Sequence, residues 1–145
     1  MMRRKADEAV RDVLRQAESL IDEERYDEAL RMHRDAMRKA MRAFQRTDDY
    51  WLLYLALYAY YGIFLCAMLT GRREEAAMAV ETGIARAGIG MERWPGVSQF
   101  VERQALFASM KWKTGLEGKP HLPEDYAHWP FDDQKFQAEV SAGGQ

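Results

Sequence analysis

The chain has 145 residues, of which 48% are hydrophobic and 30% are charged, with a formal net charge of -2 at pH 7. This length suits one domain with a sizeable core, and the composition excludes a disordered chain or a bundle of membrane helices. The nearly balanced charge gives no general attraction to nucleic acid or to an anionic bilayer. Cys66 is the single cysteine, which excludes an intramolecular disulfide and a cysteine-rich zinc site.

The N-terminal half of the chain is free of the residues that usually interrupt helices. Glycine is absent before Gly62 and proline before Pro95, which favours long helices. Apolar residues recur at helical spacing over residues 5–24 and 27–46, with charged residues on the opposite faces. The basic N-terminus leads into charged residues instead of an apolar stretch, so we expect no signal peptide and a cytoplasmic protein.

Turn and capping residues delimit three further helices. The polar run 47–49 suits the start of a helix, and Gly71 suits its end. The glycines in the run 87–90 are expected to stop the following helix, and residues 94–96 (Trp-Pro-Gly) to open another. The predicted helices therefore span residues 5–24, 27–46, 50–69, 72–87 and 94 to about Thr114.

The composition changes at Gly115. Three of the four prolines lie beyond it, together with Tyr126 and Trp129, and such aromatic rings favour packing on the helices over free solution. We therefore expect an all-α domain over residues 1–115, built from about five helices in antiparallel hairpins. Residues 116–145 are expected to form an extended tail that packs on this domain and is frayed at its last residues.

Two turns in the sequence carry a family resemblance. Residues 26–30 (Tyr-Asp-Glu-Ala-Leu) join the first two helices, with the small residue Ala17 before them and Ala36 after them. Residues 71–77 (Gly-Arg-Arg-Glu-Glu-Ala-Ala) form a second such turn. Both runs resemble the turn into the second helix of a tetratricopeptide repeat. The resemblance implies two degenerate repeat units and a capping helix over residues 6–115.

This chain also departs from the repeat in three places. Ala29 and Ala76 occupy matching positions but are 47 residues apart, whereas the repeat length is about 34 residues. Phe64 stands where the second unit has a small residue, and Gly83 replaces its closing alanine. The second and third helices are therefore longer than those of the family.

The turn at 26–30 is also similar to the start of the helical nucleotide-associated domain of toxin–antitoxin systems. RNase members of that family carry an arginine followed a few residues later by a histidine. Arg25 and His33 are too far apart for this spacing, so the family's nuclease activity is not expected.

Residues 51–69 form a run of nineteen residues without a charge. This is close to the roughly 20 residues that cross a bilayer, but four tyrosines lie in its middle and not at its ends, where membrane helices carry their aromatic residues. We therefore predict a helix buried by its neighbours, in which Cys66 is buried and inert.

One side of this helix faces the inner surface of the array if the hairpins stack as in the repeat. The residues on that side are Tyr54, Tyr58, Tyr61, Leu65 and Met68. Such an aromatic and methionine stripe suits the capture of an amphipathic helix or an apolar peptide. Two other interpretations stay open: the stripe is core, covered by helices or by the tail, or it binds a small apolar ligand.

The second helix has a basic face. Between residues 31 and 46 there are six basic residues and one acidic residue, Asp35. The arginines that share one side of the helix are Arg31, Arg34, Arg38 and Arg42. They suit an acidic protein surface or the phosphates of a nucleic acid. The alternative is a solvated face whose cations pair with the acidic residues at 22–24 and 27–28.

Candidate catalytic and metal-binding residues are few. His33 lies on the apolar side of the second helix, where we expect a core histidine whose hydrogen bonds are satisfied. His121 and His128 flank Glu124 and Asp125, a set that can bind a divalent ion, although chance spacing is the preferred interpretation. No phosphate loop, serine elbow or metalloprotease motif is present, so we expect no catalysis, no metal and no cofactor.

The sequence thus favours a non-enzymatic adaptor, chaperone-like protein or regulatory subunit that holds a protein partner on the stripe of Tyr54 to Met68. The first alternative is a structural subunit that uses the same stripe as a permanent interface. The second is a nucleic-acid-binding protein that uses the basic face of the second helix. A membrane partner is not expected.

Overall fold

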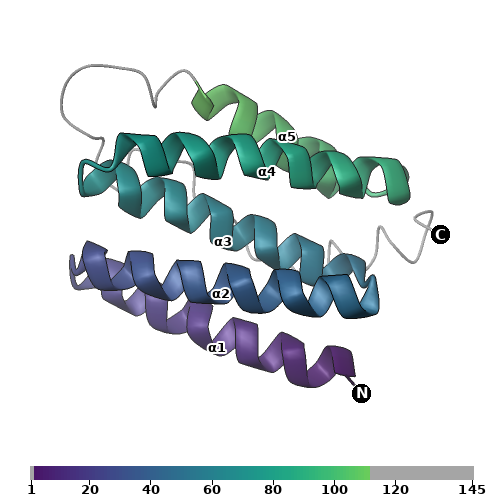
Figure 1. The fold of residues 1–145 in the computed structure, drawn as a ribbon, viewed down its shortest axis with the longest axis horizontal. Helices are drawn as coiled ribbons and strands as arrows, with labels where there is room; N and C mark the ends of the chain where they lie inside the picture. Colours follow the sequence, from purple (N-terminus) through teal and green to yellow (C-terminus); the bar gives the residue numbers. More distant parts are fainter. Residues whose placement is uncertain (1, 112–145) are drawn as a thin grey trace.

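The computed structural model describes residues 2–111, which form five α-helices packed side by side in chain order (Figure 1). The helices are α1 (Met2–Asp22), α2 (Tyr26–Thr47), α3 (Tyr50–Leu69), α4 (Arg73–Arg93) and α5 (Ser98–Lys111). Each packs mainly on the helices next to it in the chain, and no strand occurs within these residues. The predicted all-α fold is confirmed, and the array is compatible with a helical-repeat fold.

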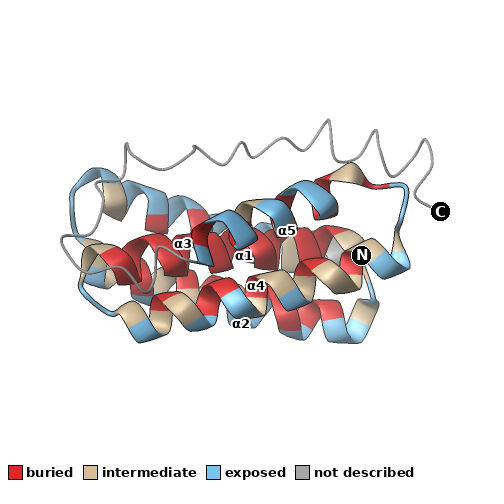
Figure 2. Cartoon of the chain, turned by 90° about the horizontal axis from the view of Figure 1, so that it is seen from above, coloured by how far each residue is buried: buried red, intermediate tan, exposed pale blue. Residues whose placement is uncertain are grey.

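α3 forms the centre of the core. Residues 51–68 are all buried, between α2 on one side and α4 on the other. By length and composition α3 could cross a membrane, but 94% of its most apolar window is buried within the protein. Figure 2 shows α3 almost entirely as buried, while exposed residues lie on the helices around it. The predicted burial of this helix is therefore confirmed.

Local chemistry sets both ends of α3. The side chain of Asp49 accepts a hydrogen bond from the backbone N–H of Trp51 at 2.9 Å, which caps the first turn. Gly71 adopts a φ of 77°, and the N–H of Arg72 then donates to the carbonyl of Ala67 at 2.7 Å. This closing turn favours glycine because its backbone is left-handed. The predicted boundaries of this helix are confirmed.

The turn between α1 and α2 places a residue other than glycine in the left-handed region. Glu24 has a φ of 59°, and the N–H of Arg25 donates to the carbonyl of Leu20 at 2.8 Å. Because a Cβ is unfavourable in this conformation, Glu24→Gly should raise the free energy of unfolding by roughly 1 kcal/mol. Urea unfolding of the variant and the wild type measures this difference. The control Glu23→Gly should not stabilise, because Glu23 forms an ion pair with Arg25; equal effects of the two substitutions contradict the prediction.

The boundaries of the fourth and fifth helices differ from the prediction. α4 does not end at residue 87 but continues through 87–90 to Arg93. α5 begins at Ser98 and not at 94–96. The predicted helix end near Thr114 and the predicted tail over 116–145, with its aromatic and histidine residues, lie outside the described residues.

The glycines inside α4 are explained by the close approach of α5. A Cβ on Gly90 would lie 2.4 Å from the ring of Phe100, and one on Gly83 would lie 2.8 Å from the ring of Phe107. Both phenylalanines belong to α5 and are fully buried. The two glycines therefore let α5 rest on the backbone of α4, and they serve helix packing instead of ending the helix.

Candidate functional site

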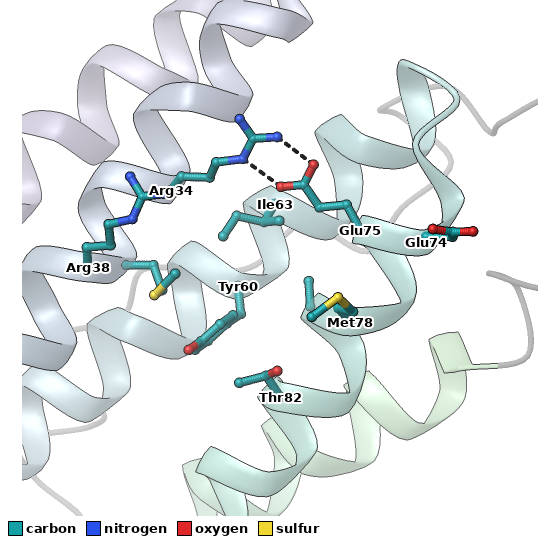
Figure 3. A pocket seen from close by; sticks show the side chains of 10 residues that line it. Arg34, Arg38, Tyr60, Ile63, Glu74, Glu75, Met78 and Thr82 are labelled. Atoms are coloured by element: carbon teal, nitrogen blue, oxygen red, sulfur yellow. Dashed lines mark hydrogen bonds and ion pairs between the residues drawn. The ribbon is translucent and has the colours of Figure 1, made fainter.

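A groove of about 540 Å³ lies between α2 and α4, with α3 as its floor (Figure 3). We call it the α2–α4 groove. The lining residues are Arg34, Met37 and Arg38 from α2, Tyr60 and Ile63 from α3, and Glu74, Glu75, Met78, Ala79 and Thr82 from α4. Those from each helix are spaced mostly by three or four residues, which places them on one face.

The apolar part of the groove combines a buried floor with an exposed side chain. Tyr60 and Ile63 are only 6% and 4% exposed, so the floor is fixed by the packing of α3. Met78 is 69% exposed, the largest value among the large apolar residues described. Methionine adapts its shape readily to a bound apolar group. Met78 thus offers an exposed apolar contact beside a floor whose own side chains are almost fully buried.

An ion pair joins the two sides of the groove. The Nε of Arg34 on α2 donates to the Oε2 of Glu75 on α4 at 2.6 Å, and Nη2 donates to Oε1 (Figure 3). The hydrogen bond from Arg34 lowers the pKa of Glu75, and the same bond raises the pKa of Arg34. Figure 3 shows the pair above Ile63, so it borders the groove near the N-terminal end of α4.

Removing this pair should cost about 1 kcal/mol of unfolding free energy. The two side chains are about one-third exposed, which limits the value of the pair, while its two-pronged geometry raises it. A double-mutant cycle with Arg34→Met and Glu75→Gln, measured by urea unfolding, should give a coupling of about this size that decreases at high salt. A coupling energy of zero would show that the ion pair of Arg34 and Glu75 does not stabilise the fold.

The basic face of α2 is split by its ion pairs. Arg34 pairs with Glu75 on α4 and not with the acidic residues at 22–24 or 27–28 that the alternative interpretation named, whereas the charge of Arg31 does act on Glu28. Lys39 pairs with Asp35 at 3.5 Å. Arg38 and Arg42 are exposed and form no ion pair within the part of the chain that the structure describes. These two arginines therefore remain available on the side of α2 that borders the groove.

The acidic residues before and within the first turn of α2 have other partners. Glu28 accepts hydrogen bonds from Arg25, which lower the pKa of Glu28. Asp27 pairs with Arg72 at 2.8 Å. The latter bond links the start of α2 to the turn before α4, so these charges fix the ends of the helices.

The predicted stripe of α3 lies on a different side of the helix from the groove. All five residues are buried, with exposed fractions from 0% to 8%; they are Tyr54, Tyr58, Tyr61, Leu65 and Met68. They form part of the core cluster. Binding of a partner on this stripe stays a prediction. The two α3 residues that line the groove, Tyr60 and Ile63, lie on another side of the helix and are buried to a similar degree.

Sequence reasoning proposed only Arg34 and Arg38 among the residues of the groove and missed the others, which include Tyr60, Ile63 and Met78. One signal was present: Met78 lies on α4 among charged positions, where an apolar side chain has no core to enter. The spacing of Tyr60 and Ile63 carries no such signal, because every neighbouring residue of α3 is apolar as well.

His33 is buried as predicted, but its hydrogen bonds are not satisfied. The ring is 1% exposed, and neither nitrogen has a hydrogen-bond partner among the described residues. Burial lowers the pKa of His33 to about 4, so the ring is neutral at pH 7. Cys66 is also buried, and burial raises the pKa of its thiol to about 12. Among residues 2–111 no cluster of three metal-ligating side chains occurs.

The chain matches no protein-family model, and no curated protein or solved structure is significantly similar to it.

Proposed function

We propose that the protein is a non-enzymatic interaction module, an adaptor or regulatory subunit, which binds a short helical segment of a protein partner in the α2–α4 groove. The observation that carries this proposal is the exposed Met78 beside the apolar floor of Tyr60 and Ile63. A flexible methionine side chain adapts its shape to a bound apolar group, and the charged residues around it suit the polar rim of a protein interface.

The size of the groove supports a helical occupant. Its volume of about 540 Å³ falls within the range of ligand sites. From Glu74 to Thr82, its lining on α4 extends about 12 Å, or roughly two helical turns. A partner helix fits this space by inserting two large apolar side chains three or four residues apart. A second copy of the same face fits poorly, because it presents another hollow.

The helical hairpins support a tetratricopeptide-like arrangement as part of this proposal. The turn at 26–30 begins α2, and the turn at 71–77 precedes and begins α4. Ala17, Ala29 and Ala76, the small residues matched to the repeat, are completely buried, which suits positions where helices approach closely. Arrays of stacked helix pairs offer extended surfaces for partners.

Affinity purification with matched variants tests the proposal. Met78→Asp places a charge in the groove, and Val101→Asp places one at the other exposed apolar residue, on α5 outside the groove. Both positions are exposed, so both variants should keep the thermal stability of the wild type. A partner identified by mass spectrometry should bind wild type and Val101→Asp and be lost with Met78→Asp.

Direct titration of the identified partner then decides the matter. The affinity for Met78→Asp should fall at least about tenfold, as for a residue at the centre of an interface. Unchanged affinity of this folded variant would falsify the groove as the binding site. Aggregation of the pure chain without its partner, seen by light scattering, would instead indicate a permanent subunit interface.

A further inference from the structure

We infer that the helix bound in the α2–α4 groove carries acidic residues along the flank that faces α2, spaced by about one turn. This inference rests on the proposed function and adds the chemistry of the partner. It follows from the charges that border the groove, because they differ between its two sides.

The α2 side of the groove carries uncompensated positive charge. Arg38 lines the groove, and Arg42 follows one turn along the same side of the helix. Both are exposed and form no ion pair within residues 5–111, as described above. Arg34 is already neutralised by Glu75, so Arg38 and Arg42 are the charges that a partner meets.

The α4 side of the groove has the opposite character. Glu75 is paired, and Glu74 is exposed at the end of the groove without an ion pair in the described structure. The remaining side chains there are Met78, Ala79 and Thr82, which carry no charge. A partner helix with acidic residues on both flanks would therefore place one acidic flank beside Glu74 and these uncharged residues, where it gains nothing.

This asymmetry also sets the direction of the bound helix. A helix whose acidic residues lie on one flank only can place them beside Arg38 and Arg42 in one of its two possible directions. The ion pair of Arg34 and Glu75 bounds one end of the groove, so the helix lies on the side of that pair toward Thr82.

Nucleic acid is the competing partner for an arginine pair. The surroundings of Arg38 and Arg42 favour a protein, because the adjoining groove has an apolar floor and the exposed face of α2 there carries no aromatic residue on which a base stacks. A single-stranded oligonucleotide is therefore tested beside the peptide probes.

Stapled helical peptides of about 15 residues are the probes, with one apolar face in common. They differ in the flank, which carries two glutamates, two glutamines or two lysines one turn apart. Fluorescence anisotropy with the full chain should give the tightest binding for the glutamate peptide, by roughly two- to fivefold for each charge pair. The difference should shrink at high salt.

Charge-reversal variants identify the residues. Arg38→Glu/Arg42→Glu should reverse the order, so that the lysine peptide binds best. Lys5→Glu/Arg15→Glu makes the same change in net charge at exposed positions on α1, outside the groove, and should keep the order of the wild type. Both positions of each variant are exposed, so the fold is retained, which circular dichroism checks.

Each other outcome is decisive. Equal binding of the three peptides, abolished by Met78→Asp, overturns the acidic flank and leaves the proposed function in place. Absence of saturable binding for all three peptides overturns both. Binding of a single-stranded oligonucleotide that is lost in Arg38→Glu/Arg42→Glu, with no preference among the peptides, assigns the arginines to nucleic acid and overturns the inference.

Discussion

Replacing Gly62 by alanine should lower the free energy of unfolding by about 3 kcal/mol. A Cβ on Gly62 would lie 2.2 Å from Cε1 of His33 and 2.3 Å from its Nδ1. The ring cannot move aside easily, because His33 is 1% exposed and residues 51–68 around Gly62 are buried. This overlap outweighs the gain of about 1 kcal/mol that alanine normally brings to a helix interior.

Two matched variants separate the overlap from helix propensity. Gly88→Ala, in α4, meets only Nε2 of Gln104 at 3.4 Å, and should be neutral or stabilising by up to about 1 kcal/mol. Gly62→Ala/His33→Ala should be less destabilised than the sum of its single changes, because the ring that the new methyl group meets is gone. Urea unfolding of these variants, of the single change His33→Ala and of the wild type checks this; a Gly62→Ala protein as stable as the wild type contradicts the contact.

Lowering the pH from 7 to 4 should remove about 3 kcal/mol of stability through His33 alone. Burial lowers the pKa of His33 from 6.5 to about 4 in the folded protein. Between these values the unfolded chain binds more protons than the folded one, so unfolding becomes more favourable as the pH falls. The stability of the folded protein with a neutral His33 is therefore fully present above pH 6.5, and about 3 kcal/mol of it is lost progressively toward pH 4.

The pH dependence of a variant without the titrating ring isolates this effect. His33→Phe keeps a flat ring beside Gly62 and cannot be protonated. Its unfolding free energy should vary less with pH than that of the wild type, by up to about 1.4 kcal/mol per pH unit in this range. Glu75, whose pKa is lowered, affects stability only near and below pH 4.5. If the unfolding free energies of the two proteins change equally with pH, the pKa of His33 is not lowered by folding.

The boundaries of α3 were predictable because local chemistry determines them. Asp49 and Gly71 act within a few residues of themselves, through a side-chain cap and a left-handed backbone. Gly90 shows the opposite case. Its role depends on Phe100 of another helix, and a glycine that admits a neighbouring ring has the same sequence pattern as one that ends a helix. The length of α4 was therefore not predictable from its own residues.

The candidate site was predictable only in part for a related reason. The basic face of α2 follows from its spacing, but the partner of Arg34 lies 41 residues away on α4. On α3, Tyr60 and Tyr61 are neighbours in sequence and point about 100° apart around the helix. Because α3 is apolar on all sides, its sequence does not tell which side the groove exposes; the placement of α2 and α4 decides it.

The central position of α3 has a consequence for synthesis on the ribosome. As α3 leaves the ribosome, α1 and α2 are available to cover one side of it, but α4 and α5 are not yet packed on the other side. The nascent chain then presents a helix of 20 residues without a charge, a stretch close to that of a membrane-spanning segment. Completion of α4 is thus the step after which chaperones and the membrane-insertion machinery lose access to it.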